Sequence, residues 1–467
     1  MTFYLDVAVV RIQSWLVRAP HLRGRRGAST MIRRATDPQA VKKILDELGG
    51  LAERNDEAGH IDGVVPLKLA TADLADAAQV ENHVVRQLRE VLPAASFATK
   101  LFEGESTIAA HATEPCCETD WPPLSPEWVL GKQCDWCRSW PASARRSDTD
   151  QKRVELCTDC LKRHTDTAGA GFATALPRGP RQPGTERDLI YLWELQPDAW
   201  ARVPDTFDEL AKLGKTGDNT HLATIHADGN AVGLLTTELR ALQRQGVAMD
   251  FDLPSAIENA TWSSLLTAVL NMDRSGADEN GVKALPITAH FVGGDDILVS
   301  VPAHAAWRFL LSMQATFAAT MSDQLGPVGL AKKSPTLSAA VVFHHRTSQL
   351  SAAVDLAGEL LDTSKKQHRG ERAALAWQDI THDGPHPIQR PSMALATLKD
   401  FRCHLDALAK LSGSAKTTLG RLFRRDPEPG HLLDHADRLA IRPTVEPFLK
   451  GDGPNLGDAL GMVRWWA

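Results

Sequence analysis

The stretch that decides the fold is residues 285–300, Leu-Pro-Ile-Thr-Ala-His-Phe-Val-Gly-Gly-Asp-Asp-Ile-Leu-Val-Ser. Two runs typical of β-strands, 285–292 and 297–301, flank the tetrapeptide Gly-Gly-Asp-Asp. Glycine adopts a positive φ without a Cβ clash, so a Gly-Gly pair between two such runs predicts a tight β-hairpin. We therefore expect two adjacent carboxylates, Asp295 and Asp296, at a turn between apolar strands.

The hairpin alone admits two interpretations, a solvated acidic turn or a site for a hard cation such as Mg²⁺ or Mn²⁺, which prefers oxygen ligands. Upstream, a short apolar strand is predicted to end at Asp228, and helical patterns follow at 231–245 and 254–272. A strand ending in Asp, two helices and an Asp-Asp hairpin is the βααββ order of a palm domain. Its sheet can bring Asp228 beside Asp295 and Asp296 as a divalent-metal site for phosphoryl or nucleotidyl transfer.

Three segments of the chain carry a resemblance to a known family. They are Ala-Asp-Gly-Asn-Ala-Val-Gly at 227–233, Phe-Val-Gly-Gly-Asp-Asp-Ile-Leu at 291–298, and Ser-Ala-Ala-Val-Val-Phe-His-His-Arg-Thr at 338–347, which a predicted helix at 350–367 follows. In this order they resemble the second palm of the large polymerase/cyclase subunit of type III CRISPR–Cas effector complexes. The resemblance is specific because all three segments occur in this order. Gly-Gly-Asp-Asp alone would not be specific.

The resemblance implies roles for particular residues. It makes the three aspartates catalytic ligands of Mg²⁺ or Mn²⁺, with ATP as the substrate. The residues implied in nucleotide binding are Gly229, Gly293, Gly294, His345 and Lys365. Glycine lets the backbone approach a nucleotide closely, and a lysine ammonium can hold a triphosphate. Two alternatives stay open: Lys365 as an exposed lysine stabilised by the helix dipole, and His345 as a core or edge histidine.

One position departs from the family pattern. The family usually has a second acid where this chain has Asn230. An amide oxygen can coordinate a cation but carries no charge, so a second metal would bind more weakly. The departure does not affect the predicted fold, and it leaves open whether catalysis is weakened or lost.

Composition predicts a folded protein of several units. The 467 residues are 43% hydrophobic and 24% charged, which suits three or four compact units. The net charge of −6 does not indicate nucleic-acid binding by the chain as a whole. No apolar run approaches the ~18 residues that a membrane helix needs. The N-terminus lacks a signal-peptide pattern, so we expect a cytoplasmic protein with no membrane contact.

The expected fold class is α+β, in four parts. Two ferredoxin-like palm domains, of the nucleotidyl cyclase type, are predicted at 1–110 and 186–375. A zinc-binding module with a linker lies between them at 111–185, and a C-terminal helical domain occupies 376–467. The first palm has no Gly-Gly-Asp-Asp equivalent, so it is expected to be degenerate. Because the chain starts almost directly at that palm, we also expect a short form of the subunit, without the family's HD nuclease domain or its activity.

Basic residues crowd one part of the first palm. Residues 11–34 carry seven arginines and no acidic residue. They form either a solvated basic face or a surface on which Arg23, Arg25 and Arg26 contact phosphate oxygens. The resemblance favours contact with guide RNA, target RNA or neighbouring subunits, but the sequence does not decide between these.

Four cysteines have the spacing of a zinc site. Cys134-Asp-Trp-Cys137 and Cys157-Thr-Asp-Cys160 give C-x₂-C-x₁₉-C-x₂-C, which suits tetrahedral Zn²⁺. Four thiolates leave no open coordination position, so the metal is expected to be structural. The adjacent Cys116 and Cys117 are weaker candidates, and their role is left open. Basic residues surround the module in sequence: Arg145, Arg146, Lys152, Arg153, Lys162 and Arg163.

The resemblance covers nearly the whole chain and implies a function. The chain would act with guide RNA, target RNA and other CRISPR subunits, and it would convert ATP into cyclic oligoadenylate signals when target RNA binds. A catalytically inactive scaffold of the same ribonucleoprotein is the first alternative, and a stand-alone nucleotide cyclase is the second. The product's ring size, the complex subtype and the downstream effector do not follow from the sequence.

Overall fold

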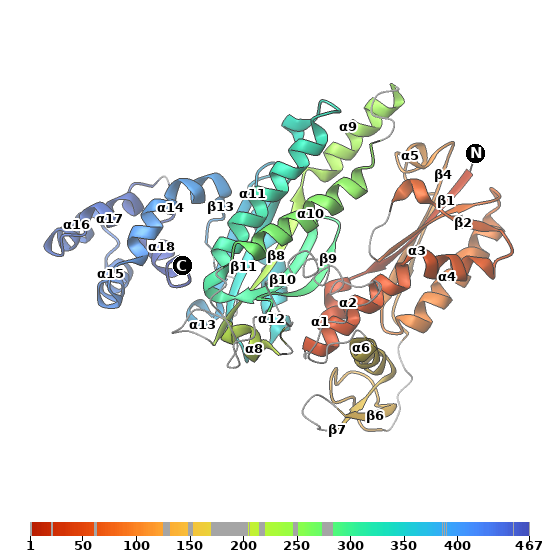
Figure 1. Cartoon of the computed structure of the whole chain (residues 1–467), viewed down its shortest axis with the longest axis horizontal. Helices are drawn as coiled ribbons and strands as arrows, with labels where there is room; N and C mark the ends of the chain where they lie inside the picture. The colour runs from red at the N-terminus through yellow and green to blue at the C-terminus, as the bar shows by residue number, and fades with distance from the viewer. Residues whose placement is uncertain are drawn as a thin grey trace.

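The computed structural model describes residues 2–19, 22–59, 63–124, 131–147, 153–169, 204, 206–213, 220–245, 251–272, 284–384, 386, 388, 390–451 and 453–466. It has a five-stranded and a six-stranded β-sheet flanked by helices, a small cysteine-bearing module with a two-stranded sheet, and a helical domain at the C-terminus (Figure 1). The predicted α+β class is confirmed. The predicted domain boundaries stay predictions, and most of the expected linker lies outside the described residues.

The first sheet has five antiparallel strands in the order β2-β3-β1-β4-β5. The strands are β1 (Thr2–Val10), β2 (Ala52–Arg54), β3 (Val64–Leu69), β4 (Ser96–Gly104) and β5 (Cys117–Trp121). The helices are α1 (Ile12–Val17), α2 (Leu22–Thr36), α3 (Pro38–Asp46), α4 (Leu74–Val91) and α5 (Thr107–Ala110). Aspartate side chains cap α3 and α4, because Asp37 and Asp73 accept hydrogen bonds from first-turn amides.

The second sheet has six strands in the order β13-β12-β11-β8-β10-β9. They are β8 (His221–Asn230), β9 (Thr288–Gly293), β10 (Asp296–Pro302), β11 (Thr336–His345), β12 (Ala374–Asp379) and β13 (Met393–Ala394). The helices are α8 (Phe207–Lys212), α9 (Val232–Arg244), α10 (Leu253–Leu270), α11 (Ala306–Leu325), α12 (Leu350–Gln367) and α13 (Ile380–Asp383). The order β8-α9-α10-β9-β10 is the βααββ order predicted for a palm.

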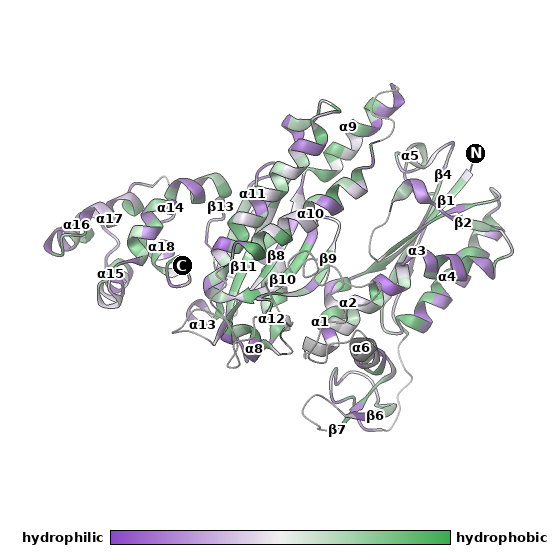
Figure 2. Cartoon of the chain, in the orientation of Figure 1, coloured by the Kyte–Doolittle hydropathy of each residue, from purple (hydrophilic) through white to green (hydrophobic). Residues whose placement is uncertain are grey.

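The two faces of the second sheet have different surroundings. Along β8, Ile225 and Ala227 belong to the apolar core formed with α10 and α11. The alternate residues, among them His226 and Asp228, point to the opposite face. On that face, residues of β10, β11 and α12 share one hydrophobic core with the first palm, and the strands are mostly green in Figure 2. Polar side chains at the end of β8 therefore lie on the side that faces the first palm.

The two palms repeat one local feature at the end of their first strand. Arg11 follows β1 with a φ of 54° and Ala231 follows β8 with a φ of 61°, and each precedes a helix. Asp228 stands three positions before Ala231. The equivalent position in the first palm is Ala8, whose partner across the ladder is Val64. The first palm therefore has apolar residues where the second has acids, as a degenerate palm should.

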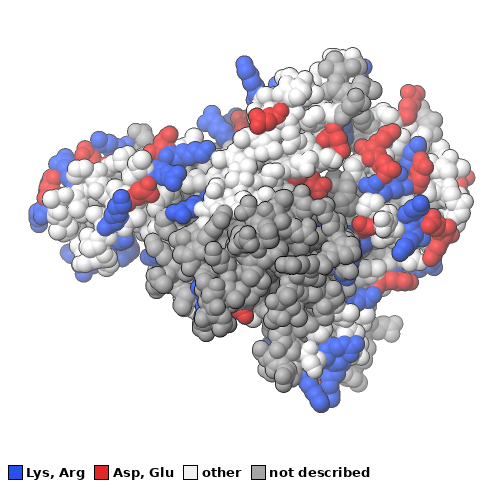
Figure 3. Space-filling model, viewed as in Figure 1, with Lys and Arg blue, Asp and Glu red and all other residues white. Residues whose placement is uncertain are grey.

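The cysteine module packs against the first palm. It contains β6 (Ala144–Ser147), β7 (Arg153–Leu156) and α6 (Thr158–Gly169). Helix α6 lies so close to α2 that a Cβ on Gly27 would overlap the backbone carbonyl of Arg163. Basic side chains gather around β6 and β7 (Figure 3), where Arg145 and Arg146 are exposed. Arg163, one of the basic residues near the module in sequence, is instead fully buried and paired with Asp159. Lys152 lies outside the described residues.

Arg25 also differs from the expectation of a basic surface. Its side chain is 1% exposed, and burial, together with nearby Arg163, lowers its pKa to about 9. A guanidinium buried in this way cannot meet the phosphates of a nucleic acid, so that role for Arg25 was wrong. The side chains of Arg23 and Arg26 lie outside what the structure describes.

The C-terminal helices pack on the second palm. They are α14 (Leu395–Ala409), α15 (Gly413–Arg425), α16 (Pro429–Arg438), α17 (Arg442–Val445) and α18 (Leu456–Met462). The ring of Trp465 stacks on Phe343 of β11 at 5.5 Å, and its Nε1–H donates to Asp379. Within the described residues, no helix is both long and apolar enough to cross a membrane.

A chain of buried polar groups crosses the second sheet. His290 Nε2 lies 2.8 Å from Ser300 Oγ, which is 3.0 Å from Thr224 Oγ1, which is 2.9 Å from His344 Nε2. His344 Nδ1 donates to the backbone carbonyl of His345 at 3.1 Å, so its Nε2 accepts from Thr224. Burial lowers the pKa of His344 to about 4 and keeps the ring neutral.

His344 should make the protein sensitive to acid. Its unfolded pKa is near 6.5 and its folded pKa is about 4, so only the unfolded chain binds the proton between these values. His344 therefore does not reduce the free energy of unfolding above pH 6.5. As the pH falls toward 4, protonation of the unfolded chain lowers that free energy by ~3 kcal/mol in all. The free energy of unfolding, measured in urea at several pH values, should fall less steeply between pH 6.5 and 4 for His344→Gln. The difference in slope should correspond to the uptake of about one proton. An unchanged pH dependence would contradict the assignment.

Candidate active site

The carboxylates of Asp228 and Asp296 lie on neighbouring strands. The β8–β10 ladder pairs Ala227 with Ile297, so the next antiparallel pair is Asp228 with Asp296. Side chains that are directly opposite point to the same face, with Cβ atoms about 5 Å apart. The two side chains are 38% and 33% exposed. The ladder thus brings two acids together where solvent reaches them.

Asp295 reaches the same place from the hairpin turn. Gly294 has a φ of 60°, and its carbonyl accepts a 2.7 Å hydrogen bond from Thr261 of α10. A Cβ on Gly229 would overlap Oδ2 of Asp295, so this carboxylate lies against the backbone next to Asp228. The turn therefore depends on glycine at 294 for its conformation and at 229 for the close approach.

Lys365 lies at the same end of the sheet. It is in the last turn of α12, and its Nζ pairs with Oδ2 of Asp228 and donates to the carbonyl of Gly229 at 2.7 Å. The side chain is 23% exposed, which differs from the freely exposed lysine of the alternative interpretation. Helix α12 thus places one ammonium directly on one of the three acids.

The three carboxylates of the site are only partly balanced by a single lysine ammonium, that of Lys365. Burial raises the pKa of Asp295, the charges of Asp228 and Asp296 raise it further, and Lys365 opposes the rise. Repulsion between like charges is the reason that a divalent cation would be favourable here. The acids are nevertheless paired one by one, since Asp228 meets Lys365 and Asp296 meets His226 at 3.0 Å.

The aspartates do not already form a closed ligand set. Among the described residues, two groups have three or more potential ligand atoms that all lie within 4.8 Å of one another. One is the four cysteines and the other is the surface group Asp426, Glu428 and His431. The acids of the hairpin and β8 share one end of the sheet, but side-chain rotation must precede joint coordination of an ion.

His345 is not at this end of the sheet. In the β11–β8 ladder, Ser338 is opposite Asp228, whereas His345 is opposite His221. Seven positions separate 338 from 345, which corresponds to about 23 Å along a strand. His345 instead bonds Thr347 at 2.7 Å. The structure therefore does not bring His345 together with the aspartates, because the strand that carries it runs away from them.

Asn230 is occupied by structural hydrogen bonds. Its Nδ2 donates to Thr336, to Ser338 and to the carbonyl of Arg372, at 3.0, 2.9 and 3.2 Å. Its Oδ1 accepts from the Ser338 hydroxyl at 3.0 Å, and the residue is 2% exposed. The amide oxygen at the position of the family's second acid therefore bonds Ser338 of β11.

Two polar residues near the acids were missed in the sequence. His226 stands two positions before Asp228, so the strand period of two placed it on the same face, and this pattern was available. Gln13 of α1 lies 2.9 Å from His226 across 213 positions of sequence. No sequence pattern indicates a contact of that kind.

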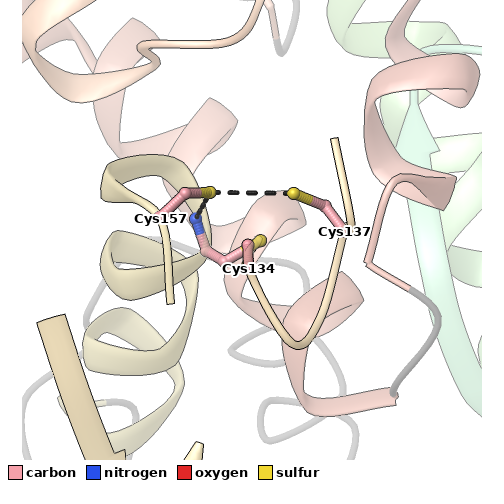
Figure 4. A group of neighbouring side chains, drawn as sticks. Cys134, Cys137 and Cys157 are labelled. Carbon is pink, nitrogen blue, oxygen red and sulfur yellow. Dashed lines mark hydrogen bonds between the residues drawn. The ribbon is translucent and has the colours of Figure 1, made fainter. Parts of the chain in front are cut away.

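The four cysteines form a second candidate metal centre, of which Figure 4 shows Cys134, Cys137 and Cys157. The Sγ atoms of Cys134, Cys137, Cys157 and Cys160 all lie within 4.8 Å of one another, and Cys137 is 3.7 Å from Cys157. Hydrogen bonds from Cys134, Cys157 and Cys160 hold the pKa of the Cys137 thiol far below its ordinary value. The predicted cluster is confirmed. Cys116 and Cys117 are exposed free thiols outside it.

Comparison with known proteins agrees with this geometry. Residues 221–376 match the family model "Cas10/Cmr2, second palm domain". This segment is therefore a palm of the Cas10/Cmr2 kind, and the predicted resemblance to the large subunit of type III CRISPR–Cas complexes is confirmed. No curated protein matches the sequence.

Solved structures extend the likeness to the whole fold. One is the apo Csm1-Csm4 cassette, with 14% identity and a TM-score of 0.51, covering 99% of this chain and 70% of that chain. Another is the Csm1-Csm4 cassette in complex with pppApApA, with 13% identity and a TM-score of 0.50, covering 99% and 69%. At these identities the comparison shows a shared fold.

Removing the charge of Asp295 should stabilise the protein. Its raised pKa means that the ionised carboxylate costs stability at neutral pH, whereas below the unfolded value of 3.8 there is no cost. Asp295→Asn should therefore raise the thermal unfolding midpoint at neutral pH, with a gain that shrinks on acidification. Asp208→Asn is the control of opposite sign, because Lys212 and then Arg346 lower the pKa of Asp208. A lower midpoint for Asp295→Asn would contradict the crowding of charges.

Proposed function

We propose that this chain is the large subunit of a type III CRISPR effector complex and that its second palm makes cyclic oligoadenylates from ATP. Synthesis would start when the complex, with its guide RNA, binds target RNA. The observation that carries the proposal is the meeting of Asp228, Asp295, Asp296 and Lys365 at one end of a Cas10/Cmr2-type palm. A cytoplasmic location belongs to the same proposal.

The residues present suit a divalent cation. Carboxylate oxygens are the ligands that Mg²⁺ and Mn²⁺ prefer. Burial raises the pKa of Asp295 most, and the charges of Asp228 and Asp296 raise it further, so a cation here would relieve repulsion among the acids. Asp228, Asp295 and Asp296 would hold the ion. When bound, it would lower the pKa of a 3′-hydroxyl and neutralise charge on the phosphates.

The protein's own residues would position the reactants. The 3′-hydroxyl of one ATP attacks the α-phosphate of another, a new phosphodiester forms and pyrophosphate leaves. Lys365 would exchange Asp228 for the triphosphate, since its ammonium already lies at this end of the sheet. The backbone at Gly294 leaves room for a nucleotide, because nothing lies where its Cβ would be, whereas Asp295 and Phe291 fill that space at Gly229 and Gly293. No dedicated side-chain base is assigned, because positioning and electrostatics dominate phosphoryl transfer.

The comparisons support the substrate and the partners. A fold neighbour of this chain is a Csm1-Csm4 cassette in complex with pppApApA, an adenylate chain, which suits ATP as the substrate here. The cassette pairs Csm1 with Csm4, which suits assembly of this chain with other CRISPR subunits. The scaffold alternative draws on Asn230, whose side chain is engaged in structural hydrogen bonds.

Substituting both hairpin acids should abolish product. With labelled ATP, Mn²⁺, guide complex and target RNA, Asp295→Ala combined with Asp296→Ala should lower product at least about 100-fold, because the ion loses two of its three acidic ligands. Assembly of the complex, followed by size-exclusion chromatography, should be unchanged. Asp434→Ala with Asp437→Ala, an exposed acidic pair of α16, is the matched control and should retain activity.

Each result of this assay has a distinct meaning. Product that requires target RNA supports the proposal. No product from the unsubstituted chain under any condition supports the inactive scaffold, and product without RNA supports a stand-alone cyclase. Loss of assembly in the double variant would show that the hairpin is structural.

The cysteine cluster is proposed to bind one structural Zn²⁺. Four thiols within 4.8 Å match the tetrahedral ligand set of zinc and leave no open position.

Metal analysis tests the zinc site. The purified chain should contain about one zinc per molecule, whereas Cys134→Ser with Cys137→Ser should lose the metal and unfold at a lower temperature, because only two thiolates remain. Cys403→Ser is the control, since this exposed thiol of α14 lies outside the cluster. A metal-free but fully stable wild-type protein would refute the site.

A further inference from the structure

Each acid of the candidate site is oriented by a different element. Lys365 of α12 holds Asp228, and the hairpin turn with Gly229 fixes Asp295. Asp296 is held by His226, whose Nε2 is 3.0 Å from Oδ1. The His226 side chain is only 9% exposed, so solvent contributes little to its orientation. What orients the ring of His226 therefore also decides where Asp296 points.

The ring of His226 has a partner in the first palm. Gln13, the second residue of α1, places its amide nitrogen Nε2 2.9 Å from His226 Nε2. Nδ1 of the same ring is buried and has no hydrogen-bond partner in the part of the chain that the structure describes. Nε2 is thus the atom through which hydrogen bonds hold this ring, and Gln13 and Asp296 share it.

Helix α1 is itself fixed by the cysteine module. Arg163 of α6 donates to the carbonyls of Trp15 and Leu16 at 2.9 and 3.3 Å and lies 4.2 Å over the Trp15 ring. Its guanidinium is fully buried and paired with Asp159 at 3.0 Å. A buried pair that also satisfies backbone carbonyls fixes geometry closely. Gln13 therefore projects from a helix whose last turn is clamped.

We propose that Gln13 and His226 are positioning residues through which the first palm completes the metal site of the second. This inference rests on the proposed function. His226 donates its Nε2–H to Oδ1 of Asp296, which leaves Oδ2 to bind the ion from a defined direction. The Gln13 amide can turn its oxygen toward the same N–H and share it. The first palm, with Ala8 and Val64 at its own acid positions, thus contributes orientation and not ligands.

The test is Mn²⁺ affinity of the full chain, measured by electron paramagnetic resonance of free Mn²⁺ without nucleotide. His226→Leu should weaken binding about 10- to 100-fold, the usual loss when a hydrogen-bond partner of a metal ligand is removed. Gln13→Ala should weaken it in the same direction but less, because His226 remains. His226→Gln should recover most of the affinity, since its amide can donate to Asp296. Gln39→Ala, an exposed glutamine of α3, should bind like the unsubstituted chain.

Turnover gives a second measurement. In complexes that make product, His226→Leu and Gln13→Ala should raise the apparent KM for Mn²⁺ while kcat at saturating Mn²⁺ is largely retained. A residue needed only for folding would instead lower kcat and the zinc content together. His226→Gln should restore the KM, and a variant series with no change in KM would overturn the inference.

The outcomes separate this inference from the proposed function. If Asp296→Asn binds Mn²⁺ as tightly as the unsubstituted chain, the metal site itself is wrong. If Asp296→Asn weakens binding while His226→Leu and Gln13→Ala do not, the proposed function stands and the positioning role is overturned. If His226→Leu folds poorly, Gln13→Ala and His226→Gln still decide the question, because Gln13→Ala leaves His226 in place and His226→Gln keeps a polar side chain beside Asp296.

Discussion

The opposition of two acids across the β8–β10 ladder is the constraint on which the candidate site depends. A slip of one residue in this ladder would turn Asp296 to the other face of the sheet. Burial prevents the slip, because Ile225, Ala227 and Ile297 sit in the apolar core beneath α10 and α11. The hydrophobic face thus fixes the register, and the register fixes the acids on the opposite face.

Electrostatics then explains why several elements converge on this end of the sheet. Three carboxylates placed together repel one another, and the protein offsets this with one ammonium, one histidine and the hairpin backbone. Each comes from a different part of the chain: α12, β8 and the turn held by Thr261. The site keeps some unbalanced negative charge, which is the state of a carboxylate cluster that binds a cation.

Local pattern predicted most of the architecture, because strand alternation and turn chemistry are short-range properties. The hairpin and the paired C-x₂-C motifs were predicted from residues close together in sequence. Asp228 was placed beside the hairpin from the order of elements, which is a stronger argument than either motif alone. For His345, direction along a strand was not considered: β11 brings Ser338, not His345, beside Asp228.

Burial and long-range contacts set the limit of sequence reasoning. Arg25 was expected in a basic surface and Arg163 stands among basic residues in sequence, yet both side chains are buried. An arginine-rich stretch does not reveal which of its members face the interior. The contact of Gln13 with His226 depends on how whole domains dock, and no local pattern encodes that.

The close approach of α2 and α6 restricts how this region can vary. At Gly27, even a single methyl group would collide with the main chain of the neighbouring helix. Arg163, whose carbonyl would be displaced, also donates hydrogen bonds to the last turn of α1. One added carbon at Gly27 would therefore disturb α2, α6 and α1. Such a position tolerates almost no mutational drift, although it touches neither a metal nor a nucleotide.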